Sequence, residues 1–229
     1  MTISFLHPLS PRGKIVFLGM EALAVTNELV ERASEHVENI ILRDQIYRLA
    51  LDEKQSSMLQ TTAEKLPQVS EWIGQNDLPP QLQREPDIRG ALRLHSGSKV
   101  IHVPSYLKGL WSVCESLGSD RISWELDKKC VSSSFDWKQK LEAFDCVVLA
   151  AGSGLIGKLV EESELPVTLV RGQAVELVAK DIQLDHAMLG GKYVSPLPDR
   201  NRILIGEMES WLLVDVDTAK KLLPTREAP

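Results

Sequence analysis

Hydrophobic positions between residues 19 and 37 repeat at the spacing of an α-helix. Residues three or four apart lie on one face of a helix, so this spacing predicts an amphipathic helix over 19–37. Glu and Arg residues occupy other positions of the segment. The apolar positions that carry the repeat are Ala22, Val25, Leu29, Ala33 and Val37.

The pattern then changes to alternation within residues 40–51. Apolar and polar residues alternate over 45–49, which is typical of a half-buried strand. Asp52 follows directly and is predicted to cap the next helix. The composition of residues 53–74 is helical, with an interruption at Pro67. A long surface connection is predicted after it from three prolines, Pro79, Pro80 and Pro86.

Two short strands are predicted at residues 91–94 and 99–102. The turn-forming sequence Ser96, Gly97 and Ser98 lies between them, so the two strands are expected to form a hairpin. They indicate antiparallel structure in this part of the chain.

A further helix is predicted over residues 103–117. Pro104 stands in its first turn and Gly118 follows its end, which are favoured positions for these residue types. Its expected apolar face is formed by Leu107, Leu110, Trp111 and Cys114.

The last third of the chain is predicted to be rich in strands. Residues 145–150 form a nearly continuous apolar run that leads to Gly152, as expected for a buried parallel strand. A short helix is predicted at 217–223. The other strands are predicted at 122–126, 129–132, 167–179, 192–195, 202–205 and 211–214.

This order of elements predicts a mixed α/β fold made of two interleaved parts. Helices and a parallel strand fall in residues 1–37 and 103–165, whereas antiparallel strands dominate 38–102 and 166–216. Residues 217–229 are expected to be a C-terminal tail.

Composition and charge narrow the classes of function. The chain has 229 residues, of which 43% are hydrophobic and 25% are charged, and its formal net charge is −6. A mildly acidic chain is not expected to bind nucleic acid, which requires neutralisation of phosphates. No apolar run approaches the roughly 20 residues of a bilayer span, so no membrane partner is expected.

The cysteines suggest a reducing compartment. Cys114, Cys130 and Cys146 lie far apart and form no CxxC pair, so no metal site is predicted. The sequence therefore favours a soluble intracellular protein, either cytoplasmic or within a plastid or mitochondrion. The chain also lacks a GxSxG motif and a paired Cys and His arrangement, which argues against a hydrolase.

Residues 152–157 form a literal GxGxxG between a predicted strand and a helical segment. Such a turn can hold a pyrophosphate at a helix N-terminus. The acid expected about 20 residues later is absent, and Arg171 stands in that neighbourhood. Three interpretations remain: a self-sufficient nicotinamide site, a turn that touches a nucleotide bound mostly elsewhere, and a purely structural turn.

Four ordered blocks of the sequence resemble the FAD-dependent oxidoreductases of the D-amino-acid oxidase and glycine oxidase type. The segment 6–14 resembles the stretch that runs beneath the flavin ring in relatives, including the flavin domain of a bifunctional tRNA-wobble-uridine-modifying enzyme. Residues 47–53 fit a strand of the substrate domain that leads into a helix. The resemblance covers nearly the whole chain, and its four blocks are residues 144–152, 165–173, 191–196 and 203–206.

The resemblance implies FAD as the cofactor and a small amine or amino acid as the substrate. Residues 1–37 with 103–165 would then belong to the FAD-binding part, and 38–102 with 166–216 to the substrate-binding part. The isoalloxazine side of the flavin would be touched by Leu6, His7 and Pro8. The adenosine side would be touched by the backbone around Val131 and by Ala150, Ala151 and Gly152.

The same resemblance implies two substrate-binding residues. Tyr193 would donate a hydrogen bond to a substrate carboxylate, and its side chain is predicted to face the segment 6–8. Met208 falls near a position that lines substrate pockets in relatives. No catalytic side chain is implied, because the flavin itself accepts hydride and a general-base role for His7 is not needed.

Two parts of the family pattern have no counterpart in this sequence. The first strand, GxGxxG and helix of the family would lie before Met1, and its closing flavin-binding segment would lie after Pro229. The sequence therefore resembles the central portion of such an enzyme, and we expect it to bind FAD weakly by itself. The alternative interpretation is a catalytically silent protein that binds another protein or a complete subunit.

Overall fold

The structure is a computed structural model of the chain. It describes residues 2–95, 97–121, 142, 144–148, 150, 173–178, 184–199 and 201–207. The chain divides into two compact units, one made of residues 1–119 and 172–229 and the other of residues 120–171. The predicted mixed α/β class is confirmed, and all helices and strands of the described residues belong to the first unit.

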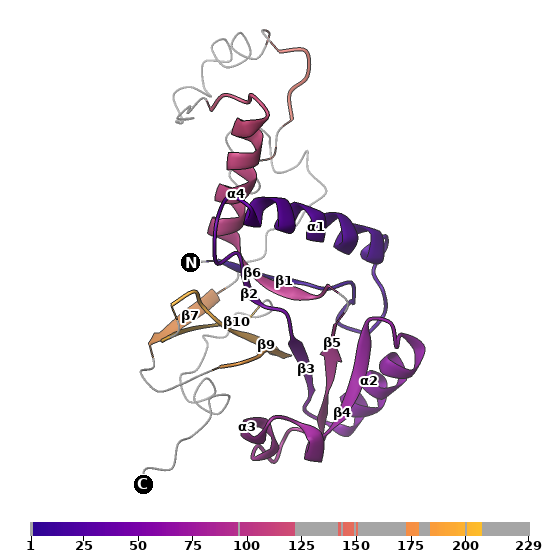
Figure 1. Cartoon of the computed structure of the whole chain (residues 1–229). Helices are drawn as coiled ribbons and strands as arrows, with labels where there is room; N and C mark the ends of the chain where they lie inside the picture. The colour runs from indigo at the N-terminus through magenta and orange to yellow at the C-terminus, as the bar shows by residue number, and fades with distance from the viewer. Residues whose placement is uncertain are drawn as a thin grey trace, which may run out of the picture. The chain divides into compact units, whose positions relative to one another are not determined.

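Helices and strands alternate along the first unit (Figure 1). Its helices are α1 (Gly19–Ser34), α2 (Glu53–Lys65), the 3-10 turn η1 (Gln75–Asp77), α3 (Pro80–Gln83) and α4 (Val103–Ser116). Its strands are β1 (Ile3–Leu6), β2 (Ile41–Arg43), β3 (Ile46–Ala50), β4 (Ser70–Gly74), β5 (Gly90–Leu94), β6 (Lys99–His102), β7 (Gln173–Val178), β8 (Ala187–Gly190), β9 (Lys192–Pro196) and β10 (Arg202–Glu207).

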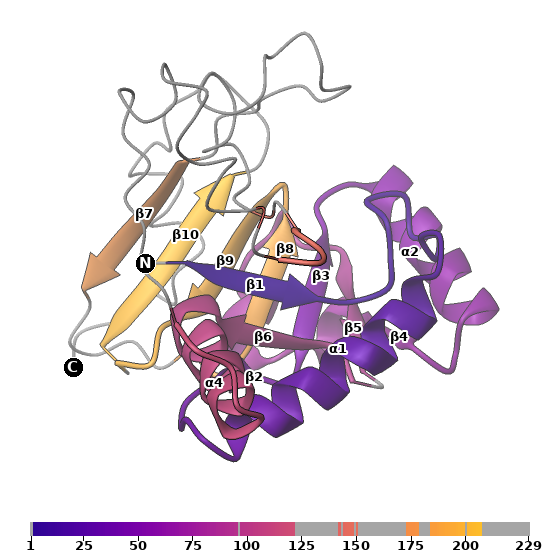
Figure 2. The same cartoon turned by 90° about the horizontal axis from the view of Figure 1, so that it is seen from above.

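Seven strands form the larger sheet, in the order β4-β5-β3-β8-β9-β10-β7. Figure 2 shows these strands side by side. Within the described residues, β3 and β8 are the parallel pair, with Ile46 opposite Ala187, and all other neighbours are antiparallel. Strands from the two ends of the sequence therefore meet at the β3–β8 pair.

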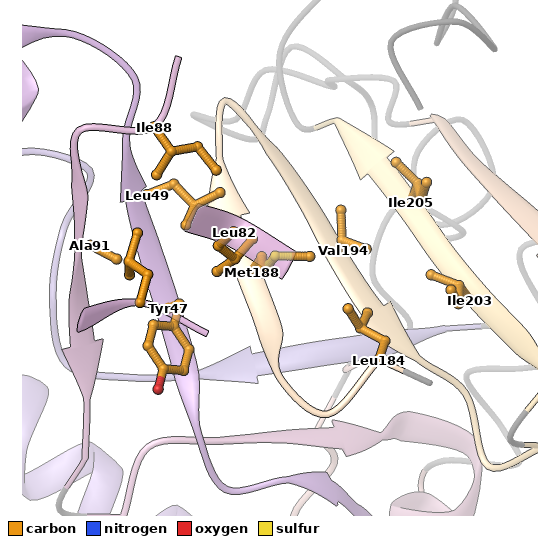
Figure 3. Packing of buried hydrophobic residues seen from close by; sticks show 11 residues of the cluster. Tyr47, Leu49, Leu82, Ile88, Ala91, Leu184, Met188, Val194, Ile203 and Ile205 are labelled. Carbon is orange, nitrogen blue, oxygen red and sulfur yellow. The ribbon is translucent and has the colours of Figure 1, made fainter. Parts of the chain in front are cut away.

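Both faces of β3 are buried in the larger sheet. Successive side chains of a strand point to opposite faces. Tyr47 and Leu49 belong to one apolar cluster, and Ile46 and Ala50 belong to another. Figure 3 shows the first cluster, in which side chains from β3, β8, β9 and β10 lie side by side on one face of the sheet. The alternation over 45–49 predicted a half-buried strand, whereas β3 is a central strand covered on both sides.

Three strands form a smaller antiparallel sheet in the order β1-β6-β2. Helices α1 and α4 pack against each other beside this sheet (Figure 1). Gly109 of α4 is essential to this approach, because a β-carbon there would lie 2.6 Å from the carbonyl oxygen of Ala33 in α1. The buried residues here are Val30, Ala33, Ile40 and Ile101.

The predicted hairpin between residues 91–94 and 99–102 is wrong, although both strands exist. Strand β5 pairs with β3 and β4 in the larger sheet, and β6 pairs with β1 and β2 in the smaller one. The glycine between them, Gly97, has a φ of 88° and leads the chain from one sheet to the other. The turn sequence therefore changes the direction of the chain here, but the two strands that flank it do not pair with each other.

Several local predictions are confirmed. Helices α1 and α4 match the predicted segments, and Gly118 follows α4 with a φ of 88°. Asp52 caps α2, since its carboxylate accepts a hydrogen bond of 2.7 Å from the backbone N–H of Gln55. However, the expected apolar face of α4 is not a buried stripe, because Leu107 is 58% exposed and Gly109 is the residue of α4 that is buried.

Two segments with a helical or loop-like composition have a different structure. Residues 70–74 form β4, because pairing with β5 outweighs their helical composition. The predicted surface connection contributes to the core instead. It contains η1 and α3, and it buries Leu78, Leu82 and Ile88 against the larger sheet.

The predicted buried strand at 145–150 is wrong for the residues that the structure describes there. Residues 145–148 and 150 form no strand, and Val148 is 82% exposed. A buried parallel strand needs partner strands along its edges, and none of the described strands pairs with this run. The segments predicted at 122–126, 129–132, 211–214 and 217–223 lie outside the described residues.

The proposed division into interleaved parts, 1–37 with 103–165 and 38–102 with 166–216, stays a prediction.

The helices were also compared with the requirements of a membrane span. Among those that the structure describes, none has the length and apolar character that a membrane span requires.

Candidate functional site

Tyr193 of β9 lies against the N-terminal strand β1. Its ring packs edge-on against Phe5, with a distance of 5.8 Å between ring centroids and an angle of 61° between the planes. Phe5 directly precedes Leu6, so the side chain of Tyr193 lies on the face of the larger sheet that is turned toward β1. Phe5 is the residue before the segment 6–8, and the orientation of Tyr193 toward that segment itself stays a prediction.

Gly206 of β10 makes room for the Tyr193 ring. The two residues are directly opposite each other in the antiparallel pair of β9 and β10. A β-carbon on Gly206 would lie 2.1 Å from both Cζ and Oη of Tyr193, far inside van der Waals contact. Phe5 and Gly206 therefore hold the ring between them.

The hydroxyl of Tyr193 is free to act as a donor. Within the described residues, its Oη forms no hydrogen bond, although the side chain is half-buried. Burial raises the pKa of Tyr193 above its ordinary value, so the phenol stays protonated at neutral pH. A half-buried phenol without a partner is a suitable donor for an anionic ligand group.

His7 is held as a neutral imidazole. Burial lowers its pKa, and the positive charge of Arg48 lowers the pKa further. The backbone N–H of Leu9 donates a hydrogen bond of 3.3 Å to Nδ1 of His7. In the neutral ring the proton consequently lies on Nε2.

The segment after β1 is anchored by its backbone. Pro8 is fully buried, and its carbonyl oxygen accepts a hydrogen bond of 2.9 Å from the N–H of Val16. An isolated β-bridge joins Leu9 to Ile15 and closes the segment into a loop. We call residues 7–15 the N-terminal loop.

Arg48 of β3 clamps the N-terminal loop to the larger sheet. Its guanidinium donates a hydrogen bond of 2.7 Å to the carbonyl oxygen of Ser10 and another to that of Pro11. This role of Arg48 was not predicted from the sequence. The available signal was a long cationic side chain inside an otherwise apolar strand, between Tyr47 and Leu49, where a buried guanidinium requires acceptors.

The adenosine-side assignment of Val131, Ala150, Ala151 and Gly152 stays a prediction. Ala150 belongs to the second unit, where it is exposed and lies outside any strand. The other residues assigned to this side and to the substrate pocket lie outside the described residues, as do the GxGxxG at 152–157 and Arg171. They are Val131, Ala151, Gly152 and Met208.

Comparison with models of protein families identifies one family. A family model described as FAD dependent oxidoreductase matches residues 4–227 of the chain. No curated protein matches the chain by sequence.

Solved structures share the fold at low sequence identity. Glycine oxidase from Geobacillus kaustophilus is 18% identical, with a TM-score of 0.57, and the match covers 90% of this chain and 60% of that one. L-proline dehydrogenase from P. horikoshii is 9% identical, with a TM-score of 0.55, and the match covers 94% of this chain and 64% of that one. The chain thus spans less than two thirds of the length of either protein.

Proposed function

We propose an activity from one premise: the chain belongs to the family of FAD-dependent oxidoreductases. FAD is the cofactor of that family. The chain forms the substrate-facing part of an enzyme that oxidises a small amine or amino acid. The observation that supports this proposal is the half-buried phenol of Tyr193, which packs against Phe5 and has no hydrogen-bond partner among the described residues.

The character of residues 6–8 supports a flavin ring at this segment. An isoalloxazine is flat and mostly apolar, so the surface beneath it should be uncharged. Leu6 is a half-buried apolar side chain, and the lowered pKa of His7 keeps that ring neutral. Pro8 is fixed by burial and by its hydrogen bond from Val16. These residues would hold the isoalloxazine, and the adenosine side is assigned to Val131, Ala150, Ala151 and Gly152.

FAD, when bound, supplies the hydride acceptor for the carbon that bears the amine. The chain then has to orient the substrate. Tyr193 donates its hydroxyl proton in a hydrogen bond to the substrate carboxylate, and Phe5 and Gly206 fix the angle of its ring. Met208 is assigned to the wall of the same pocket. No side chain has to remove a proton from the substrate, so a neutral His7 is compatible with this role.

The activity test uses the whole chain with FAD in excess and a series of small amino acids and amines. Under anaerobic conditions, oxidation of a substrate bleaches the visible absorbance of bound flavin. Tyr193→Phe is expected to raise the substrate concentration for half bleaching several-fold, since a hydrogen bond worth about 0.5 to 1.5 kcal/mol is lost. The matched control is Tyr106→Phe in α4, which should behave like the unaltered protein. Bound FAD that no amine bleaches would refute the activity.

A second candidate function is a catalytically silent protein that binds another protein. One observation favours it: the second unit exposes the apolar side chains of Phe144, Val147 and Val148, which are 50%, 41% and 82% exposed. The test that separates the two functions is flavin retention. A chain that holds no FAD at any concentration would favour this second function.

A further inference from the structure

A cavity of about 580 Å³ lies between the N-terminal loop and helix α2, away from Tyr193. Its volume falls within the range of small-molecule sites. One wall is formed by residues of the loop and the other by one face of the helix. The lining residues are Arg12, Gly13, Lys14 and Ile15 from the loop, and Lys54, Ser57, Met58, Thr61, Thr62, Lys65 and Leu66 from α2 and its end.

The helical wall carries a regular set of polar groups. Positions three and four apart lie on one face of a helix, and the lining residues of α2 follow this spacing from Lys54 to Lys65. A lysine stands at each end of the face, and the hydroxyl groups of Ser57, Thr61 and Thr62 stand between them. The hydroxyls of Thr61 and Thr62 donate to the backbone carbonyl oxygens of Ser57 and Met58. The donors that this face offers to a ligand are therefore the two lysines and the hydroxyl of Ser57.

The loop wall is held close to the helix by a glycine. Gly13 has a φ of 71°, and a β-carbon there would lie 2.2 Å from Oγ1 of Thr62. Arg48 anchors the same loop through the carbonyl oxygens of Ser10 and Pro11. These contacts fix the backbone that carries Arg12 and Lys14, so the cavity has a built wall on each side.

The charges around the cavity are all positive. No carboxylate is among its lining residues, and Glu53 at the start of α2 pairs with Arg89 instead, at 3.7 Å. In the part of the chain that the structure describes, the side chains of the four cations form no ion pair or hydrogen bond. The cations are Arg12, Lys14, Lys54 and Lys65.

Four unpaired cations around one space repel one another, and a bound anion would remove this repulsion. The whole chain carries a net charge of −6, so the cavity is positively charged within a protein that is negatively charged as a whole. Ile15, Met58 and Leu66 add an apolar surface to the same cavity.

We propose that this cavity binds a phosphate ester that also has an apolar portion. The lysines, the arginine and the hydroxyl of Ser57 would hold the phosphate, and Ile15, Met58 and Leu66 would contact the apolar portion. The same chemistry is offered by a soluble phosphate ester and by the headgroup of an anionic phospholipid. None of its lining residues is among Leu6, His7, Pro8, Tyr193 and the other proposed flavin and substrate residues, and its test needs no flavin.

The soluble probe is phenyl phosphate, measured by isothermal titration calorimetry on the whole chain, with benzyl alcohol as the uncharged comparison. The lipid probe is a vesicle of phosphatidylcholine and phosphatidylglycerol, compared with phosphatidylcholine alone in a sedimentation assay. Two variants remove charge from opposite walls, Lys54→Gln with Lys65→Gln, and Arg12→Gln with Lys14→Gln. The matched control removes the same charge elsewhere, with Arg84→Gln and Lys108→Gln.

We expect one of the phosphate-bearing probes to bind, and each cavity variant to weaken that binding about tenfold or more. The control variant should bind as the unaltered chain does. Binding of phenyl phosphate identifies a soluble ligand, and binding of anionic vesicles alone identifies a lipid headgroup. The proposal is overturned if neither probe binds, or if the control variant loses as much affinity as the cavity variants.

Discussion

The ring of Tyr193 occupies the space that a side chain on Gly206 would need. The two residues face each other across β9 and β10, and the ring lies over the α-carbon of the glycine. Because Phe5 contacts the same ring edge-on, Tyr193 is packed from two sides. The packing of the ring against Phe5 and Gly206 therefore helps to set the direction in which its hydroxyl points.

Gly206→Ala is expected to displace the Tyr193 ring. A β-carbon at 2.1 Å from Cζ and Oη cannot be accommodated without movement, and such overpacking costs about 1 to 3 kcal/mol of unfolding free energy. Urea unfolding measures the cost, and near-ultraviolet circular dichroism reports the ring. The control is Gly74→Ala in β4, where the new β-carbon would meet Asp77 at an ordinary 3.6 Å. Equal stability of the two variants would contradict the packing described for Tyr193.

Arg48→Met should release the N-terminal loop from the larger sheet. The substitution removes the donors to the carbonyl oxygens of Ser10 and Pro11, and hydrogen bonds from a charged group contribute about 1.5 to 3 kcal/mol. We expect a lower midpoint of urea unfolding and faster proteolytic cleavage within residues 7–15. Arg84→Met, at an exposed position, serves as the control. If cleavage within the loop is no faster than in this control, Arg48 does not anchor the loop.

His7 should make the protein less stable as the pH falls below about 6.5. Its pKa is lowered in the folded chain from the ordinary value of 6.5, so the unfolded chain binds a proton there before the folded chain does. Protonation consequently favours the unfolded state, and the stability is regained above pH 6.5. Thermal unfolding between pH 5 and 8 measures this slope. His7→Gln should reduce the change of stability with pH. If this change is the same in His7→Gln and in the unaltered chain, His7 titrates alike in the folded and unfolded states.

The pKa of His7 should rise when Arg48 is replaced by Met. The positive charge of Arg48 disfavours the imidazolium, so its removal leaves burial as the main cause of the lowered pKa. Titration of the imidazole by nuclear magnetic resonance measures the change. A His7 pKa that is the same in both proteins would show that the guanidinium exerts no field on this ring.

Asp52→Ala is expected to destabilise the first turn of α2 by about 1 kcal/mol, because the cap to the N–H of Gln55 is lost. Chemical denaturation provides the measurement. Asp87→Ala, at an exposed position, should change stability by less than about 0.5 kcal/mol. If the two variants were equally stable, Asp52 would not be acting as a cap.

Local signals predicted local structure well. Helices α1 and α4 and the cap at Asp52 follow from residues within a few positions of one another. Pairing between distant segments was not predictable in the same way. Residues 91–94 and 99–102 look like a hairpin because the turn between them is favourable, yet their partners lie elsewhere in the chain.

The candidate site was predictable in part. The family resemblance implied roles for Leu6, His7, Pro8 and Tyr193 that stay predictions, and the structure shows that Tyr193 contacts Phe5 of β1. The role of Arg48 was not predicted, because its position within an apolar strand signals that it needs acceptors but does not show that they are the carbonyl oxygens of Ser10 and Pro11. The apolar run at 145–150 shows the converse case, since hydrophobicity alone does not supply the partner strands that a buried strand needs.

The parallel pair of β3 and β8 has a consequence for the order of folding. Strands β3, β4 and β5 are close in sequence, and so are β8, β9 and β10, but Ile46 and Ala187 meet only after most of the chain has been synthesised. Contacts of such long range form slowly. On the ribosome, the β3 edge would therefore wait, unpaired, while the intervening residues emerge. We expect this edge to be the point at which nascent chains aggregate or recruit chaperones.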